Sequence, residues 1–268
     1  MASVRALVIS GNGTNCERET AHACRLAGAA VRVVPIWDLV AGEVRLDDFQ
    51  FLCLPGGFMD GDDLGAARAC ANRYRHARLG SGQRLWDALR EFVQAGKLVL
   101  GICNGFQLMV KLGLLPELDP FRPRQRVTLT FNDSGRFEDR WVELVVDPDS
   151  PCVFTRGLER LALPVRHGEG KLVAPDAAAR RDLEQRWLVP LRYAAPAGGP
   201  TEAYPHNPNG SPGGAAALCD PSGRLFGLMP HPEAYTHRTH HPRWTRLPAL
   251  PEQGAGLALF HNAVDTLA

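Results

Sequence analysis

The sequence predicts an α/β fold with a mostly parallel central sheet that is flanked by helices. Two observations support this prediction. The chain opens in β-α-β order, because a continuous apolar run at residues 4–10 and a second strand segment at 31–36 enclose a helical segment at 17–27. Residues 98–109 then begin as an apolar strand, turn through two glycines and continue as an amphipathic helix. Uninterrupted apolar runs are typical of parallel strands that are buried on both faces.

The other elements of the sheet and its helices follow from apolar runs, helical patterns and turn residues. In the first half of the chain we expect a strand at 49–54, a helix with a mobile loop within 61–82, and an amphipathic helix at 85–95. In the last quarter we expect a hairpin of 215–218 and 225–228, a surface excursion at 235–254, and a closing helix at 256–267.

An antiparallel segment interrupts this α/β pattern. Alternating residues at 127–146, with a turn at 132–135, predict antiparallel strands inserted on the main sheet, and a strand at 161–165 follows. Residues 180–192 mix charges with strand-forming side chains, and the basic cluster at 122–126 is expected to be a solvated loop. Since no repeat or linker divides the sequence, we expect one domain over 1–268.

Composition and charge restrict the class of partner. The 268 residues are 45% apolar, which is enough for a sizeable core, and the net charge of +1 gives no general attraction for nucleic acid. No apolar run has membrane-spanning length, and the N-terminus enters a strand without a signal segment. We therefore expect a cytoplasmic protein whose partners are small molecules or proteins, with no nucleic acid and no membrane.

Cysteine usage agrees with a reducing compartment. The seven cysteines are odd in number and lack CxxC spacing, which indicates free thiols. Cys16 lies in a polar turn, whereas five others lie in apolar or small-residue surroundings and are expected to fill the core: Cys24, Cys53, Cys70, Cys152 and Cys219.

Cys103 is the candidate nucleophile. It lies at the predicted strand-to-helix reversal, with Gly101 and Gly105 two residues to either side. Glycine tolerates the strained backbone and close contacts of such a turn. A sulfur at a helix N-terminus is favoured as the thiolate. From this stretch alone, an ordinary buried cysteine at a βα turn is an equally good interpretation.

The C-terminal part of the chain supplies a candidate base. Pro230 and Pro232 hold His231 in an extended backbone, so that His231 and Glu233 project to the same side. A carboxylate there can orient one imidazole nitrogen and leave the other for a thiol. Gly56 and Gly57, which follow the strand at 49–54, are candidate oxyanion donors through their backbone N–H groups.

Two other patterns carry less weight. Residues 11–13, Gly-Asn-Gly, could cradle a phosphate, but the dinucleotide fingerprint and the P-loop lysine are both missing. His237, His240 and His241 have no cysteine or acidic ligand at a fitting spacing, so we expect an exposed polar loop there and no metal site.

Several motifs together resemble the triad-type glutamine amidotransferases, and more narrowly the family of glutaminase components of phosphoribosylformylglycinamidine synthases. The motifs are Gly-Thr-Asn-Cys at 13–16, Pro-Gly-Gly-Phe at 55–58, Gly-Ile-Cys-Asn-Gly-Phe-Gln at 101–107, His-Gly-Glu-Gly at 167–170, Asn-Pro-Asn-Gly-Ser at 207–211 and Pro-His-Pro-Glu at 230–233. The resemblance runs from the first strand to the last helix.

The resemblance implies a flavodoxin-like sheet and a catalytic triad of Cys103, His231 and Glu233. It further implies that glutamine and the oxyanion are bound by the second set of site residues, which are Gly56, Gly57, Phe58, Asn104, Gln107, His167 and Glu169. Ammonia would pass to a synthetase subunit, with or without a further small subunit. That partner would bind ATP and Mg²⁺, so this chain would need no cofactor of its own.

The sequence departs from the family pattern at two places. Ala234 stands where the family usually has arginine after Pro-His-Pro-Glu, and Met59-Asp60 stands where small or aromatic residues are more usual. Two alternatives stay open at this point: a cysteine hydrolase or peptidase of the same architecture, and a non-catalytic regulatory module. Because uncoupled hydrolysis wastes glutamine, we expect weak glutaminase activity without the partner.

Overall fold

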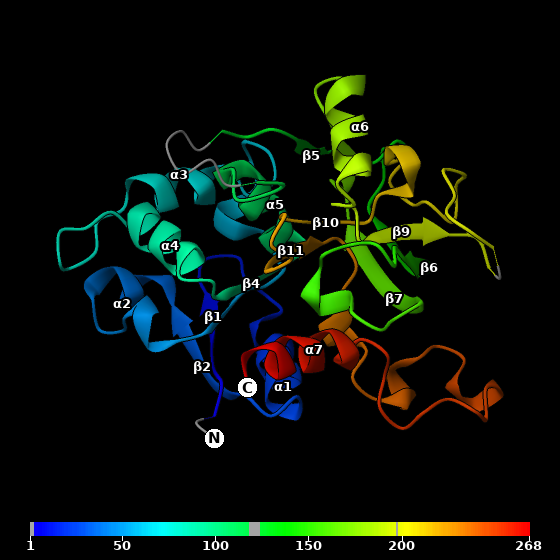
Figure 1. Ribbon diagram of the computed structural model, residues 1–268, viewed down its shortest axis with the longest axis horizontal. Helices are drawn as coiled ribbons and strands as arrows, with labels where there is room; N and C mark the ends of the chain where they lie inside the picture. Colours follow the sequence, from blue (N-terminus) through cyan, green and yellow to red (C-terminus); the bar gives the residue numbers. More distant parts are fainter. Residues whose placement is uncertain (1–2, 118–123, 197) are drawn as a thin grey trace.

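A mostly parallel sheet forms the centre of the protein (Figure 1). Within residues 3–117, 124–196 and 198–268, which the computed structural model describes, the sheet has six strands in the order β2-β1-β3-β4-β11-β10. Their bounds are β1 Arg5–Ser10, β2 Ala30–Pro35, β3 Phe51–Leu54, β4 Leu98–Ile102, β10 Ala217–Cys219 and β11 Leu225–Leu228. All neighbours are parallel except β10 and β11, which form the predicted hairpin. The first five strands have the flavodoxin-like order, so the predicted fold class is confirmed.

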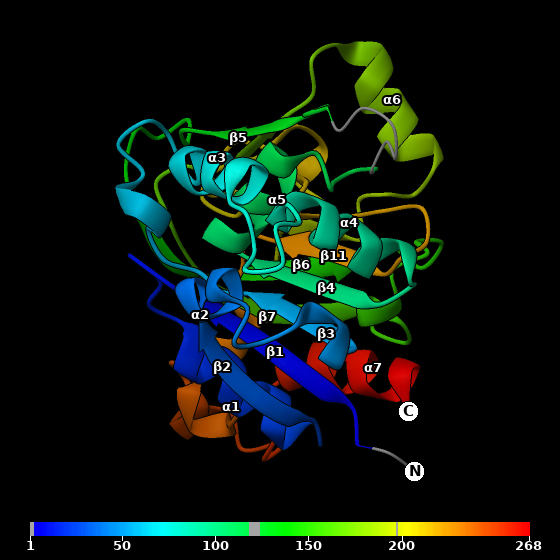
Figure 2. The same cartoon turned by 90° about the vertical axis from the view of Figure 1, so that its left-hand side faces the viewer.

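Helices cover both faces of this sheet (Figure 2). Helices α3, α4 and α5 lie on one face, and α1 and α7 lie on the other, while α2 directly follows β2. The bounds are α1 Glu17–Leu26, α2 Ile36–Ala41, α3 Arg68–His76, α4 Leu85–Gln94, α5 Asn104–Leu112 and α7 Leu257–Leu267. The predicted helices at 17–27, 85–95 and 256–267 are therefore confirmed to within about two residues, the usual uncertainty of helix ends.

The burial of each strand depends on its position in the sheet. Every residue of β3 and of β4 is buried, because both strands lie inside the sheet with helices above and below. Strand β2 lies at an edge, and only Val34 in it is buried. The core therefore extends along both faces of the inner strands. Because these strands are parallel, their carboxyl ends lie at one edge of the sheet.

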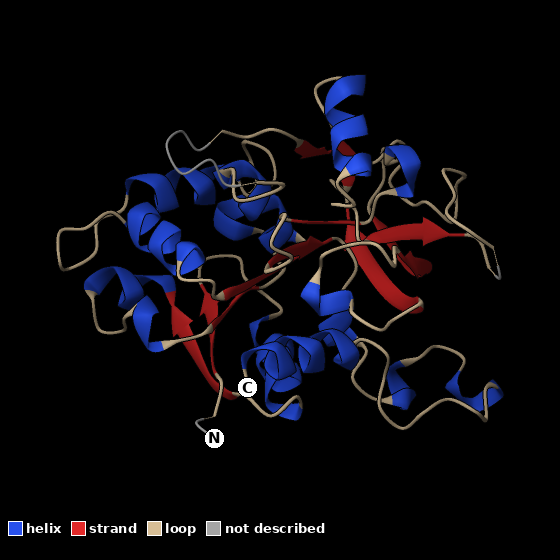
Figure 3. Ribbon diagram, viewed as in Figure 1, coloured by secondary structure: helices blue, strands red, loops and turns tan. Residues whose placement is uncertain are grey.

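The antiparallel insertion lies beside the central sheet, as the strands on the right of Figure 3 show. Its elements are β5 Thr128–Thr130, β6 Glu138–Val146, β7 Arg160–His167, β8 Lys171–Val173, α6 Ala177–Gln185 and β9 Leu191–Ala194. They form the antiparallel sheets β7-β6-β9 and β5-β8, which are separate from the central sheet. The predicted antiparallel insertion is therefore confirmed, but its strands form sheets of their own and do not extend the main sheet.

The turn at 132–135 also behaves differently from the prediction. It does not close a hairpin, because β5 pairs with β8 and not with β6. The reason lies in Asn132, whose backbone N–H donates to Gly168 O at 2.9 Å and whose side chain donates to His167 O at 2.8 Å. These bonds tie the turn to the end of β7.

Two further segments complete the comparison. Residues 180–192 contain most of α6, which Asp176 caps by accepting from Ala179 N–H at 2.7 Å, and the start of β9. The helix was not predicted. The first two residues of the basic cluster at 122–126 lie outside the described residues.

The excursion at 235–254 contains short 3₁₀ turns and is mostly exposed from residue 242 to residue 253, as predicted, but His241, which was expected in an exposed loop, is buried. Its start is anchored, since Tyr235 is buried and meets Trp141 of β6 edge to face at 5.0 Å, and His241 lies 5.0 Å from the same indole. None of the helices in the described part of the chain combines the length and apolar composition needed to span a bilayer.

Candidate active site

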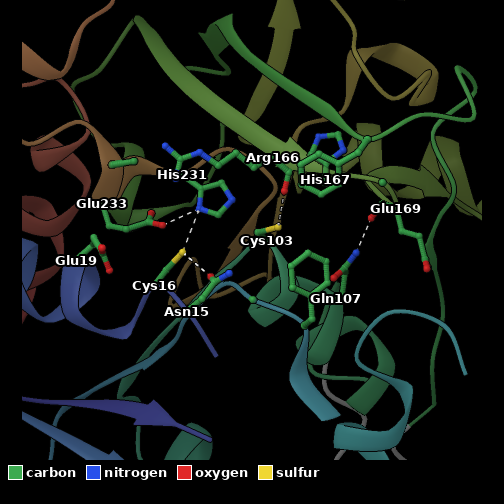
Figure 4. Close-up of a pocket in the computed structure, with 15 residues that line it drawn as sticks. Asn15, Cys16, Glu19, Cys103, Gln107, Arg166, His167, Glu169, His231 and Glu233 are labelled. Atoms are coloured by element: carbon green, nitrogen blue, oxygen red, sulfur yellow. Dashed lines mark hydrogen bonds and ion pairs between the residues drawn. The ribbon is translucent and has the colours of Figure 1, made fainter. Parts of the chain in front are cut away.

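The candidate site lies at the carboxyl edge of the central sheet, where the loops after β1, β3, β4 and β11 meet. These strands are neighbours and run parallel, so their carboxyl ends share one edge. A cavity of about 280 Å³ opens there (Figure 4). This is the edge at which open α/β sheets bind ligands.

Cys103 occupies a strained turn between β4 and α5. Its φ of 52° and ψ of −106° are unusual for a residue with a side chain, which confirms the predicted sharp reversal. Both flanking glycines are needed, because a Cβ on Gly105 would lie 1.8 Å from Leu54 O and one on Gly101 would lie 2.5 Å from Met109 Sδ. The turn is held by a hydrogen bond from Cys103 N–H to Leu228 O at 2.8 Å. The thiol thus stands at the N-terminus of α5, where the helix dipole favours negative charge.

His231 and Glu233 form a buried pair beside this cysteine. His231 Nδ1 and Glu233 Oε1 lie 2.6 Å apart, and the side chains are 3% and 1% exposed. His231 N–H donates to Pro164 O of β7 at 2.8 Å, which fixes the extended backbone between the two prolines. A Cβ placed on Gly56 would lie 3.0 Å from His231 Cε1 and 3.5 Å from Cys103 Cβ, so both side chains converge over this glycine.

The charge state of His231 follows from these neighbours. Burial lowers the pKa of the imidazole, but the charges of the Glu233 carboxylate and of the nearby Cys103 raise it by more. The net result is a pKa of His231 well above its ordinary value. Nε2 of His231 and Oε2 of Glu233 are buried and have no hydrogen-bond partner among the described residues. Nε2 is thus left for a thiol or a substrate.

The segment after β3 offers one backbone donor to the cavity. Phe58 N–H donates to Gly13 O at 2.7 Å, and Gly56 O accepts from Asn15 N–H at 3.2 Å. Gly57 N–H takes no part in this exchange. The φ of Gly57 is +145°, and an added Cβ would lie 2.3 Å from Gly13 O, so only glycine fits there.

The side chain of Asn104 is used to hold this segment. Its Oδ1 accepts from Met59 N–H at 2.7 Å, and its Nδ2 donates to Asp62 Oδ2 at 3.0 Å and to Gln107 Oε1 at 2.8 Å. The amide is 1% exposed. The side chain of Asn104 is therefore fully engaged in holding this segment, and its backbone N–H, at the first position of α5, is the group left as a candidate oxyanion donor.

Three more predicted residues line the opposite wall of the cavity. Gln107 Nε2 donates to Glu169 O, and Glu169 Oε2 accepts from Ala66 N–H at 3.2 Å. His167 lies 3.0 Å from Asn132 Oδ1 through its Nδ1, and burial together with the nearby His231 lowers its pKa to about 3. His167 is therefore neutral in the physiological range. In Figure 4, Cys103 lies between this group and the His231–Glu233 pair.

The structure thus brings all the predicted site residues to one edge of the sheet, although Gly56 and Asn104 do not line the cavity itself. Residues that the sequence analysis did not assign to the site also line it, among them Cys16, Glu19, Phe137 and Arg166. Cys16 belongs to the motif at 13–16, which was the available signal. Arg166 could have been found only by its position next to His167. Ala234 lines the cavity with a methyl group.

One group of metal-ligating side chains gathers within residues 3–117, 124–196 and 198–268. Ligand atoms of Cys16, His231 and Glu233 all lie within 4.8 Å of one another. The histidines of the C-terminal excursion are not part of it. His237 pairs with Thr239 Oγ1 at 2.8 Å, and His241 lies against Trp141.

This fold and site define the class of α/β proteins that carry a cysteine at the turn after a central parallel strand, with a histidine and a carboxylate from a neighbouring strand end. Residues 3–266 match the family described as "CobB/CobQ-like glutamine amidotransferase domain". The chain belongs to this glutamine amidotransferase family.

Individual relatives agree with this family. The chain is 44% identical, over 98% of both sequences, to the phosphoribosylformylglycinamidine synthase subunit PurQ of Dehalococcoides mccartyi. It is 39% identical to the PurQ subunit of Methanococcus maripaludis, over 97% of this chain and 96% of that one. Among solved structures, a chain of PurLQS from Thermotoga maritima superposes with a TM-score of 0.71 at 28% identity, over all of both chains.

Proposed function

We propose that this chain is the glutamine-hydrolysing subunit of a phosphoribosylformylglycinamidine synthase and that it delivers ammonia to a synthetase subunit. One observation carries the proposal: Cys103 stands on a strained turn at a helix N-terminus, beside a buried pair in which His231 Nδ1 and Glu233 Oε1 lie 2.6 Å apart. The PurQ relatives cover nearly the whole chain and support the assignment of this site to glutamine.

In the first half of the reaction, the Cys103 thiolate attacks the side-chain carbonyl carbon of glutamine. The developing oxyanion is stabilised by the backbone N–H groups of Gly57 and Asn104, which need no reorganisation because both belong to fixed turns. His231, which carries the thiol proton, donates it from Nε2 to the departing nitrogen. Ammonia leaves, and a thioester links Cys103 to the glutamyl group.

In the second half, His231 removes a proton from water as the water attacks the thioester. The tetrahedral intermediate collapses, the C–S bond breaks, glutamate leaves and the Cys103 thiolate is restored. Glu233 acts throughout by accepting the Nδ1 hydrogen bond, which fixes the tautomer and stabilises the imidazolium. The seven remaining predicted residues, Gly56, Gly57, Phe58, Asn104, Gln107, His167 and Glu169, form the glutamine and oxyanion site in this proposal.

The partner and location follow from the same proposal. A synthetase subunit, alone or with a further small subunit, receives ammonia before it becomes ammonium, and that partner binds ATP and Mg²⁺. This chain needs no cofactor of its own for thioester chemistry. We place the complex in the cytoplasm, where the free thiols of Cys103 and the other six cysteines stay reduced.

Labelling and turnover test the proposal. A glutamine-analogue electrophile is expected to modify Cys103 alone, as mapped by peptide mass, and Cys103→Ser is expected to abolish both labelling and glutamine hydrolysis. Cys24→Ala is the matched control, since Cys24 is fully buried in the core beneath the sheet and its loss should leave both readouts in place.

Glutamine hydrolysis is measured with and without the synthetase, its nucleotide substrate and ATP, and we expect weak activity for the isolated chain. An adduct on another cysteine, or turnover of peptides but not of glutamine, contradicts the proposal and favours a cysteine hydrolase. Loss of all turnover in the complete mixture favours a regulatory module.

A further inference from the structure

Cys16 is a second thiol at the site, and the proposed reaction does not use it. It follows the β1 loop and reaches the floor of the cavity from the side opposite Gln107 (Figure 4). Its Sγ lies 4.0 Å from His231 Nδ1 and donates to Asn15 Oδ1 at 3.0 Å. Glu233 Oε1 lies 2.6 Å from the same Nδ1. A thiol, an imidazole nitrogen and a carboxylate therefore face one another at a point that the cavity reaches.

We propose that Cys16, His231 and Glu233 form an inhibitory site for a borderline-soft divalent cation such as Zn²⁺. Thiolate, imidazole and carboxylate are the ligands that Zn²⁺ prefers, and three protein ligands with a fourth open position are common in zinc sites. The fourth position would face the cavity. Binding displaces the Cys16 thiol proton and the His231 Nδ1 proton to solvent.

The distances suit a tetrahedral ion after small movements. Zinc–ligand bonds of about 2.0 to 2.3 Å place the sulfur about 3.5 Å and the oxygen about 3.4 Å from the ligating nitrogen. Cys16 Sγ, now 4.0 Å from Nδ1, must approach slightly, and Glu233 Oε1, now at 2.6 Å, must retreat. The other carboxylate oxygen, Oε2, is buried without a hydrogen-bond partner among the described residues and offers a second ligand atom.

The inhibition rests on the proposed glutaminase function, whereas the metal site does not. An imidazole that ligates a metal through Nδ1 keeps its only ring proton on Nε2. His231 in that state cannot take the proton of Cys103 or of water. The Cys103 thiol itself stays free, and glutamine can still enter the cavity, so inhibition is expected to lower kcat with little change in KM.

Cobalt tests the site by a readout other than activity. Co²⁺ added to the metal-free full chain is expected to give a near-ultraviolet thiolate-to-cobalt absorption band, which stoichiometric Zn²⁺ removes. The band should persist in Cys103→Ser, which lacks the other thiol of the site, and in the core control Cys24→Ala. It should be lost in Cys16→Ser and in Cys16→Ala, two variants that guard against misfolding of either one.

Inhibition of glutamine hydrolysis by Zn²⁺ is the second test of the proposed site. Zn²⁺ should inhibit glutamine hydrolysis by the wild-type chain with its partner present, EDTA should reverse the inhibition, and the inhibitory concentration should rise at least about tenfold in Cys16→Ser. A band that is lost in Cys103→Ser but kept in Cys16→Ser, or inhibition that competes with glutamine, overturns the proposal in favour of metal binding to Cys103. Absence of any band also overturns it. A cobalt band on a chain that never hydrolyses glutamine leaves the metal site in place and refutes the proposed function instead.

Discussion

Replacement of Glu233 by glutamine tests how much the negative charge of the carboxylate beside His231 contributes to catalysis. The two side chains meet at 2.6 Å and are almost fully buried, so water cannot take over the role of the carboxylate. The glutamine side chain keeps an oxygen that can accept the Nδ1 hydrogen bond, and it has nearly the same volume as glutamate. The substitution therefore removes the negative charge while it preserves the tautomer and the packing.

The expected cost can be bracketed. Two unit charges about 4 Å apart attract by about 4 kcal/mol at the effective dielectric constant of about 20 that describes protein sites, which sets the upper bound. The lower bound is the difference between a charge-assisted and a neutral hydrogen bond, about 1.5 kcal/mol. Since about 1.4 kcal/mol corresponds to a factor of ten, kcat for glutamine hydrolysis should fall between about 10-fold and 1,000-fold, with KM nearly unchanged.

Steady-state glutamine hydrolysis with the synthetase partner measures this loss, and thermal unfolding checks that the variant is folded. Glu143→Gln is the matched control. Glu143 is 37% exposed and lies 3.9 Å from Arg160, so the same chemical change there removes only a surface ion pair and should leave kcat unaltered. A folded Glu233→Gln variant with less than a threefold loss in kcat would show that the carboxylate does not support the imidazolium, and the mechanism would need another orienting group.

Three further outcomes are expected. Gly56→Ala should lower kcat by about tenfold or more with little change in the melting temperature, because the new methyl group would lie 3.0 Å from His231 Cε1, and small misplacements of reacting groups are costly. Stability curves at several pH values should show that His167→Gln weakens the acid sensitivity of the fold. Burial and His231 lower the pKa of His167 from 6.5 to about 3 in the folded protein. As the pH falls below 6.5, the unfolded state therefore binds a proton that the folded state does not, and the free energy of unfolding decreases by up to about 1.4 kcal/mol per pH unit. Asp62→Ala should lower the unfolding free energy by about 1–2 kcal/mol in urea and slow glutamine turnover, since Asp62 accepts from Asn104 Nδ2 at 3.0 Å, whereas Asp62→Asn, which tolerates the φ of +56°, should retain most of both.

The central sheet was predictable because its signals are local. Strands β1, β3 and β4 are mostly apolar runs bounded by turns, and the parallel arrangement follows from the helices between the strands. The insertion was harder, because β5 finds its partner β8 about forty residues away through bonds of Asn132 that no periodicity encodes. Helix α6 was missed because charged residues mask its short apolar face, although Asp176 before three alanines was a usable cap signal.

Some residues of the candidate site were also predictable from local sequence, whereas others were not. The proposed catalytic residues were predictable because neighbouring glycines or prolines constrain the backbone around Cys103, His231 and Glu233. Cys16 and Arg166 reach the cavity from loops and strand ends whose own sequence says little about the direction they face. Their place in the site depends on how the loop after β1 and the end of β7 pack against β4, which is tertiary information.

The end of β7 also sets the geometry between the cysteine and the histidine. Its Pro164 carbonyl accepts from His231 N–H at 2.8 Å, and its Arg166 carbonyl accepts from the Cys103 thiol at 3.5 Å. Strand β7 of the insertion therefore contacts both His231 and Cys103 through its backbone carbonyl groups. No pattern of residue types can predict such backbone contacts. Because β7 belongs to a sheet separate from the one that carries Cys103, the separation of thiol and imidazole depends on how the insertion docks against the central sheet.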